Sequence, residues 1–492
     1  MHRRTVTFLF FAGAASLGLT GCTIVGHDYA TPSGAALPDA WSQSVARDLQ
    51  GSKSSGIAGW WKGFQDPTLN ALIDRARESN PELQIALERV TEARAQRGIA
   101  ASQGLPQVNA GGDYQRRRAS ESLLGPAPAQ NPSNLYTAGF DAGWEIDLFG
   151  GIRRSVEAAE ASIGAREEDY RDALVTLFAD VALNYAEYRT LEARLAVAES
   201  NIAAQRGSVE LTQRRLDAGL VPKIDVTQAQ TNLALSESLL PQLRAQMTHA
   251  RNRLSTLTGG FPGSLDSLLD KSRPIPLPKS GYAAGLPADL VRARPDIRRA
   301  ERELAAQTAL IGVAEADLYP RFTLFGDFSL QAVNSGNLLD SRSRAYAFGP
   351  AFQWQIFSSG RIRNAIKVEE SRTARAYSAY EATVLRAVEE VETSMASIAH
   401  ERDRLADIER AVAASRETVS LIKNNYENGL VSFQNVLDAE RTKFSAEDEE
   451  TVSRGQIARH YITLYKALGG GTATELVPPP AASQPESKPA QP

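Results

Sequence analysis

Few residues of this 492-residue chain have a type and spacing that could carry out chemistry. The sequence contains neither a His-Glu-x-x-His zinc motif nor a Gly-x-Ser-x-Gly nucleophile motif, and its only cysteine is Cys22. The five histidines are scattered, at positions 2, 27, 249, 400 and 460. The sequence therefore predicts no catalytic residues, no metal site and no cofactor, and it argues against an enzyme of the cell envelope.

Cys22 follows a segment with the features of a secretion signal. A basic start at residues 2–4 precedes a short apolar run at residues 8–19, and Leu19-Thr20-Gly21 leads into the cysteine. This pattern is similar to a bacterial lipobox, in which the cysteine is acylated and becomes the new N-terminus. Thr23 follows in place of the Asp that resembles an inner-membrane retention signal, so we expect a lipid-anchored outer-membrane protein. The alternative is an ordinary signal peptide that happens to contain a cysteine.

The composition is that of a folded protein. Hydrophobic residues make up 42% of the chain and charged residues 23%, which indicates neither disorder nor a helical membrane bundle. Removing residues 1–21 leaves 52 basic and 58 acidic residues, a net charge of −6, so nucleic acid is not an expected partner. With Cys22 acylated, no cysteine remains for a disulfide.

The rest of the chain is organised around a turn that occurs twice, at Asp217–Val221 and at Glu427–Val431. Each turn lies between a long helical pattern and a shorter one. Gly219 and Gly429 stand where a helix commonly ends in a left-handed residue, and they lie 210 residues apart.

The offset of 210 residues recurs elsewhere. It pairs Trp144 with Trp354, and further upstream an offset of 214 pairs Pro106 with Pro320. The first half therefore carries four additional residues, between Asp113 and Trp144. A repeat of this length predicts two copies of one structural module.

Each module contains two stretches in which apolar and polar residues alternate. The clearest is residues 136–148, and residues 107–115, 321–331 and 346–356 are similar. Four strands of about 11 to 14 residues fit the wall of a membrane β-barrel, where a tilted strand needs roughly 9–11 residues. A soluble sandwich would show the same alternation. Aromatic residues on the apolar side, such as Phe140 and Trp144, favour the membrane.

Helical patterns join these strands. Long ones run over residues 152–216 and 362–426, about 97 Å each, and their frequent charges exclude a membrane span. Shorter ones run over residues 67–102, 222–258 and 286–318, and Pro241 predicts a kink or break within the second of these. Its counterpart at the 210 offset is Thr451, so the halves should differ there. Four prolines predict an extended connector from residue 261 to residue 286.

Four strands cannot span a bilayer alone, because the two open sheet edges would expose unpaired backbone groups to hydrocarbon. The chain must complete a barrel with copies of itself. Two copies would give eight strands, whose interior side chains fill, and three would give 12, which leaves a passage. A homotrimer is therefore expected.

The sequence resembles the TolC-like outer membrane factor family, most closely its lipoprotein branch of NodT-type components of RND efflux systems. The resemblance rests on these stretches: Leu286-Pro287-Ala288-Asp289-Leu290, Arg294-Pro295-Asp296-Ile297-Arg298, Ala300-Glu301, Ile311-Gly312-Val313-Ala314, Tyr319-Pro320, Trp354-Gln355-Ile356-Phe357, Gly360, Tyr426 to Val431, and Val436-Leu437-Asp438-Ala439. It implies a membrane α+β fold with a two-fold internal repeat, in which four strands per chain form a 12-stranded trimeric barrel above a periplasmic α-helical barrel.

The resemblance also implies a function and partners. It implies a passive exit duct for small molecules, supplied by an inner-membrane RND transporter through a periplasmic adaptor. The two turns would form the periplasmic tip, where Gly219, Leu220, Val221, Gly429, Leu430 and Val431 would meet the adaptor.

The resemblance also implies that gate residues lie beside the periplasmic tip. By position they are Asp225, Asn435 and Asp438, with Asp438 as the main anionic ring because Asn435 replaces an acid of other members. Tyr426 matches a latch tyrosine, whereas Val431 stands where those members carry a latching Arg, so another residue such as Lys223 would have to serve. From the residues alone, Asp225 and Asp438 are ordinary exposed helix charges.

These inferences give the following organisation: a signal peptide at residues 1–21, a lipid-linked tether at 22–59, a first efflux repeat at 60–260, a linker at 261–286, a second repeat at 287–470 and a disordered tail at 471–492. Two other hypotheses about the function remain. An adaptor protein would have one helical hairpin, where this chain shows two. A duct for secreted protein or polysaccharide would share the whole fold.

Overall fold

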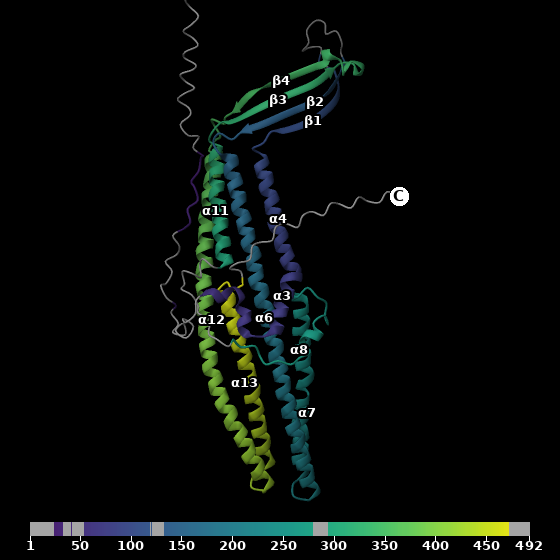
Figure 1. Ribbon diagram of the computed structural model, residues 1–492, viewed down its shortest axis with the longest axis vertical. Helices are drawn as coiled ribbons and strands as arrows, with labels where there is room; N and C mark the ends of the chain where they lie inside the picture. Colours follow the sequence, from purple (N-terminus) through teal and green to yellow (C-terminus); the bar gives the residue numbers. More distant parts are fainter. Residues whose placement is uncertain are drawn as a thin grey trace, which may run out of the picture. The chain divides into compact units, whose positions relative to one another are not determined.

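The computed structural model describes residues 24–32, 41, 54–118, 120, 132–278 and 294–471, and Figure 1 shows its helices and strands. Cys22, most of the predicted tether, residues 286–293 and the predicted tail from residue 472 lie outside the described residues. The chain divides into two compact units. Unit 1 comprises Met1–Ser33, Val90–Arg166 and Ala300–Tyr380, and unit 2 comprises Gly34–Arg89, Glu167–Arg299 and Glu381–Pro492.

Unit 1 holds an antiparallel four-stranded sheet in the order β1-β2-β3-β4 (Figure 1). Its strands are β1 (Gln107–Arg117), β2 (Ser133–Ile146), β3 (Arg321–Ala332) and β4 (Arg344–Gln353). The central pair, β2 and β3, joins the two repeats. There Gly139 lies opposite Ser329, and a Cβ added to Gly139 would lie 2.5 Å from the carbonyl oxygen of Phe328. Only a glycine permits this close approach.

An aromatic row crosses the sheet. Phe140 is paired with Phe328, which is paired in turn with Tyr346. These three side chains are 59%, 47% and 73% exposed in the chain. In a soluble sandwich a second sheet would bury such a row. The strands within the described residues form this one sheet, which argues against the sandwich.

The sequence overestimates the length of two strands. The alternating pattern continues to Leu148 and Ile356, but β2 ends at Ile146 and β4 at Gln353. The last pairs on this side of the sheet are Ile146 with Phe322 and Gln353 with Arg321, so β2 and β4 both end where β3 begins.

Two long helices have equal lengths and equivalent bounds. α6 (Gly151–Asp217) and α12 (Arg361–Glu427) each contain 67 residues, and every position of one maps onto the other at the 210 offset. Each follows a glycine with positive φ, 85° at Gly150 and 83° at Gly360. Both long helices are confirmed. No helix in the described part of the chain is long and apolar enough to cross a membrane.

The helical pattern at residues 67–102 forms two helices instead of the single one expected. α3 (Pro67–Ser79) and α4 (Pro81–Ser102) are separated by Asn80, whose φ and ψ are −74° and 122°. A residue before proline is pushed out of the helical region, and Pro81 is suited to the first turn of a new helix. The Asn80 side chain fixes the break, because it accepts a hydrogen bond from the Leu83 N–H and donates one to the Leu257 carbonyl.

The helices after the two turns differ as expected. α7 (Lys223–Glu237) and α8 (Leu239–Leu257) are interrupted at Ser238, with Pro241 in the first turn of α8, whereas α13 (Phe433–Ala467) is continuous through Thr451. α11 (Pro295–Ala316) is shorter than the predicted 286–318, since Arg294 precedes it in non-helical backbone. The connector includes a four-residue helix, α9 (Asp266–Leu269), so it is not wholly extended.

The core of unit 2 is aromatic where the body of the chain begins. The 3-10 helix η1 (Ser54–Phe64) carries Trp60, which is fully buried and stacks on Tyr465 of α13 with ring centroids 5.0 Å apart. Trp61 packs edge-on against Phe178 of α6. These contacts fix the start of the first repeat onto the helices that carry the turns.

Candidate functional site at the paired turns

Both turns have the backbone geometry of a Schellman motif. Gly219 and Gly429 have φ of 71° and 73°. The N–H of Leu220 donates to the Arg215 carbonyl at 2.8 Å, and the N–H of Leu430 donates to the Asn425 carbonyl at the same distance. A Cβ on either glycine would meet nothing within 4 Å, so the positive φ alone calls for glycine here.

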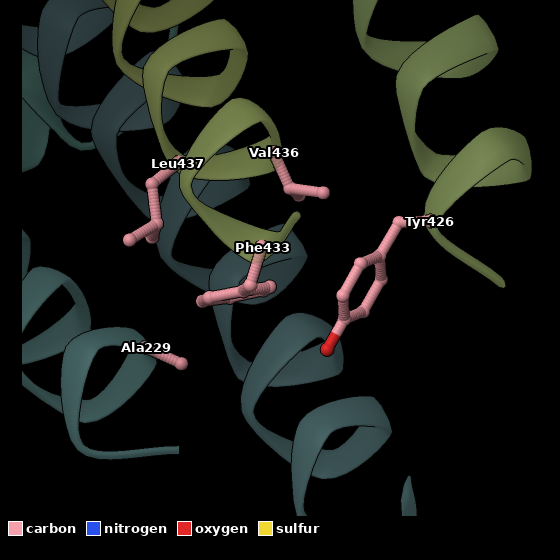
Figure 2. Packing of buried hydrophobic residues seen from close by; sticks show 5 residues of the cluster. All are labelled: Ala229, Tyr426, Phe433, Val436 and Leu437. Atoms are coloured by element: carbon pink, nitrogen blue, oxygen red, sulfur yellow. The ribbon is translucent and has the colours of Figure 1, made fainter. Parts of the chain in front are cut away.

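A small hydrophobic cluster lies behind the turns. Its buried members are Ala229, Tyr426, Phe433, Val436 and Leu437, shown in Figure 2. Val221 and Val431 from the turns pack against it. Their neighbours Leu220 and Leu430 remain 65% and 72% exposed. The tip residues therefore divide into an inward valine and an outward leucine in each turn.

Tyr426 lies at the centre of this site. Its ring is 3% exposed, and it packs against Phe433 of α13 with ring centroids 5.3 Å apart (Figure 2). Its hydroxyl donates a hydrogen bond to Asp225 Oδ2 at 3.2 Å. Burial, followed by the charge of Asp225, raises the pKa of Tyr426 to about 12. The hydroxyl therefore remains a hydrogen-bond donor at neutral pH.

Asp225 is placed by the start of α7. It lies in the first helical turn, where the unpaired N–H groups and the helix dipole favour a negative charge. The side chain is half-buried, and its acceptor Oδ2 faces Tyr426 of α12, 201 residues away. This pairing joins a residue after the first turn to a residue before the second turn.

Arg215 completes the site, and sequence reasoning missed it. Its guanidinium carbon lies 5.0 Å from the centroid of the Tyr426 ring, and Nη1 donates to the Glu427 carbonyl at 2.6 Å. The spacing of Ser208, Thr212 and Arg215, by four and then three residues, places them on one face of α6 and could have indicated that Arg215 faces inward. Ser208 and Thr212 are indeed buried. Lys223, which the sequence suggested as a substitute cation, is exposed at the start of α7.

Asn435 and Asp438 lie apart from this group. Both are exposed on α13, on the side away from buried Phe433 and Val436. Asp438 accepts a hydrogen bond from Gln434 Nε2 at 3.0 Å, and Asn435 accepts one from Ser432 Oγ at 2.9 Å. The four predicted gate residues thus form two sets, the contacting pair Tyr426 and Asp225 and the exposed pair Asn435 and Asp438.

The chemistry of this site is that of contact and charge. Hydrogen bonds, a cation over an aromatic ring and apolar packing can hold two turns together or release them. Within the residues that the structure describes, no group of three or more His, Cys, Asp or Glu side chains could hold a metal ion.

The Arg294-Pro295-Asp296 motif has a structural role. Arg294 forms two hydrogen bonds with the Asp296 carboxylate and donates from Nη1 to the Ala467 carbonyl at the end of α13, at 2.7 Å. Burial opposes the ionised form, but the hydrogen bonds and charge of Arg294 outweigh it and hold the pKa of Asp296 below its usual value. The motif fixes the start of α11 against the end of α13.

The described chain begins two residues after Cys22, and its first segment is tightly held in unit 1. The Val25 N–H donates to the Phe149 carbonyl at 3.0 Å. Arg154 donates from Nε to the Val25 carbonyl and from Nη2 to the Gly26 carbonyl, both at 3.0 Å, and its side chain is 4% exposed. A Cβ on Gly312 would lie 3.0 Å from the Val25 carbonyl oxygen. Sequence reasoning did not anticipate this contact.

Comparison with known proteins matches most of the chain. A family model described as "Outer membrane efflux protein" matches residues 72–260 and 286–470. Nodulation protein T of Rhizobium leguminosarum bv. viciae is 30% identical over 478 residues, 96% of each chain. The pyoverdine export outer membrane protein OpmQ of Pseudomonas putida is 30% identical over 93% of this chain and 96% of its own.

Solved structures agree with this match. The outer-membrane channel OprN superposes with a TM-score of 0.84 at 34% sequence identity, over 91% of this chain and 99% of OprN. The TolC-like fold expected from the sequence is therefore confirmed.

Proposed function

The chain belongs to the outer membrane efflux protein family, and from this premise we propose that it is the outer membrane exit duct of a tripartite efflux system. It would release small molecules passively. An inner-membrane RND transporter would supply them, together with the energy, through a periplasmic adaptor. The name of the OpmQ relative, a pyoverdine export protein, favours small-molecule efflux over the alternative, a duct for secreted protein or polysaccharide.

The proposal rests on the exposed sheet of unit 1, which contains all the strands in the described part of the chain. β1 and β4 are its edges, and its aromatic row is exposed in the isolated chain. Pairing β1 of one copy with β4 of the next would satisfy the edge backbone groups, and the aromatic row would face lipid. Three copies give a 12-stranded barrel with an open passage, continued by a tunnel of periplasmic helices. The protein is accordingly a homotrimer.

Acylation of Cys22 would add a lipid anchor to this barrel in the outer membrane. The chain would then comprise a signal peptide at residues 1–21, a tether, two repeats joined by a linker, and a tail. The contacts of Arg154 with residues 25–28 support this anchor, because a fixed segment shortly after Cys22 would hold the acyl chains at a defined place on the protein.

The paired turns would form the gated periplasmic mouth. Tyr426 and Asp225 latch it, supported by their direct hydrogen bond, and Asp438 with Asn435 forms a polar ring, supported by their exposure. The exposed Leu220 and Leu430, beside Gly219, Val221, Gly429 and Val431, meet the adaptor. Adaptor binding opens the mouth only to the extent that it prefers the open state to the closed state.

Planar-bilayer recording tests the proposal, with the oligomeric mass of the same detergent-solubilised sample measured by native mass spectrometry. A trimer that gives discrete steps of low conductance is expected. A well-folded monomer without conductance would overturn both the barrel and the duct.

A further inference from the structure

We infer that Arg215 is the positioning residue that ties the two turns together and keeps the proposed periplasmic mouth closed; the inference rests on the exit duct proposed above. Arg215 lies at the end of α6, two residues before the helix ends at Asp217. Its side chain is half-buried and crosses to the second turn.

The contacts of Arg215 reach both turns. Its backbone carbonyl accepts the hydrogen bond that closes the first turn, from Leu220. Its side chain donates to the Glu427 carbonyl, the last residue of α12, at 2.6 Å. The carbonyls at a helix C-terminus lack intrahelical partners and carry partial negative charge, so a cation there satisfies an acceptor and opposes the dipole.

The same guanidinium fixes the ring that carries the proposed latch. Arg215 Cζ lies 5.0 Å from the Tyr426 ring centroid, within the range of a cation–π interaction. Tyr426 is thereby held by Arg215 at its ring and by Asp225 at its hydroxyl. Without the cation, the ring loses one of the contacts that orient its hydroxyl toward Asp225.

The repeat makes this arrangement unique within the chain. At the 210 offset, Arg215 corresponds to Asn425, Tyr426 to Leu216, and Asp225 to Asn435. The first repeat therefore supplies the cation and the acid, and the second repeat supplies the aromatic ring. The other half has no equivalent residue that could replace Arg215, so we expect its substitution to have its full effect on the open-state population.

Conductance of the purified full-length protein in planar bilayers tests this inference. Arg215→Met keeps the apolar stem and removes the cation, and Arg214→Met is the matched control, since Arg214 is 68% exposed and lies 4.0 Å from Glu210 on its own helix. We expect Arg215→Met to raise the open-state population about fivefold, Arg215→Lys to raise it less, and Arg214→Met to leave it unchanged.

Variants of Tyr426 test the contact between the Arg215 guanidinium and the Tyr426 ring by changing the ring. Tyr426→Phe keeps a ring beneath the cation and loses only the bond to Asp225, whereas Tyr426→Leu loses both. Tyr426→Leu should therefore raise conductance more than Tyr426→Phe does. Combining Tyr426→Leu with Arg215→Met should add less than the sum of the single effects, because both remove one shared contact.

The outcomes separate the two proposals. A wild-type protein without conductance overturns the exit duct itself. A conducting wild type whose Tyr426→Phe variant opens, while Arg215→Met behaves like Arg214→Met, overturns only the role of Arg215. If Arg215→Met does not assemble, the Arg215→Lys and Tyr426→Leu comparisons decide: equal conductance of Tyr426→Leu and Tyr426→Phe overturns the cation contact.

Discussion

At the scale of single residues, Tyr426 is the point where the segments beside the two turns meet. Its ring lies beneath the Arg215 guanidinium and its hydroxyl donates a hydrogen bond to Asp225, and both partners come from the first repeat. Since neither partner lies within 200 positions of Tyr426 in the sequence, the group exists only in the folded chain.

The raised pKa of Tyr426 predicts how the proposed latch depends on pH. Because the folded-state pKa is about 12 against an ordinary value of 10.0, the contribution of the hydroxyl is complete below pH 10 and is lost as pH rises from 10 through 12. We expect conductance in bilayers to stay constant between pH 8 and pH 10 and then rise. The Tyr426→Phe variant, which lacks the titrating hydroxyl, should start higher and show no such rise; an identical rise would contradict the assignment.

Asp438 differs from Asp225 in exposure, and this difference predicts different effects of mutation. Asp438 is exposed and its carboxylate accepts a hydrogen bond from Gln434 of its own helix, so Asp438→Asn should change the ion selectivity of the proposed mouth without opening it. Asp225→Asn should open the mouth, because it weakens the hydrogen bond from Tyr426.

Reversal potentials in a salt gradient, recorded together with conductance, check both statements. Gln434→Ala, which removes the side-chain partner of Asp438, should leave selectivity unchanged. If Asp438→Asn and the wild type have the same ion selectivity, the proposal that Asp438 lines the mouth is contradicted.

At the scale of elements, Gly139 determines how closely the two repeats can pair. Gly139→Ala should weaken the β2–β3 pairing by about 1–3 kcal/mol, because the new methyl group would lie 2.5 Å from the Phe328 carbonyl oxygen and the backbone would have to move. Gly143→Ala on the same strand is the matched control, as a Cβ there meets nothing within 4 Å.

Thermal unfolding of the detergent-solubilised protein, followed by loss of the oligomer on gels, measures this difference between the glycines. Only Gly139→Ala should lower the midpoint. Equal midpoints for the two variants would show that the β2–β3 pair has room to separate.

The long helices could be predicted closely from sequence because local signals mark their ends. Gly150, Gly219, Gly360 and Gly429 all have positive φ at the predicted boundaries, and Pro241 marks the break between α7 and α8. The break at Asn80 was missed although Asn-Pro is also a local signal, since the helical pattern continues on both sides of it.

The contacts of the site could be predicted only in part. The positions of Tyr426 and Asp225 were identified from the family resemblance, but their mutual hydrogen bond was not. The role of Arg215 depends on a contact between α6 and the end of α12, and the docking by Arg154 depends on a contact with residues 25–28. Such contacts follow from the packing of distant segments, which no local pattern records.

At the scale of the whole molecule, the repeats and the compact units differ. Each unit contains segments of both repeats. In the sheet, β1 and β2 belong to the first repeat and β3 and β4 to the second, so the two repeats meet at the β2–β3 pair. A single repeat would lack half the strands of the sheet and either Tyr426 or its partners Asp225 and Arg215, so we expect neither repeat to fold or function alone.

Cys22 gives a prediction for the intact protein in the cell. Cys22→Ser should abolish the incorporation of labelled palmitate, while secretion into the envelope continues, because the apolar segment at residues 8–19 is unchanged. Metabolic labelling followed by membrane fractionation checks this outcome. Labelling that persists in Cys22→Ser would exclude the lipobox, and Thr23→Ser serves as a neighbouring control.

The equal lengths of α6 and α12 restrict how this protein can gain or lose residues in evolution. One inserted residue in either helix would advance its end by about 1.5 Å and rotate it by about 100°. In α6 that rotation would turn Arg215 away from Tyr426. The strand connections already differ in length between the halves: 15 residues separate β1 from β2 and 11 separate β3 from β4, which accounts for the four-residue difference. Insertions and deletions among relatives should therefore collect in those connections and at the chain ends, and peptide tags placed between β1 and β2 should leave export intact.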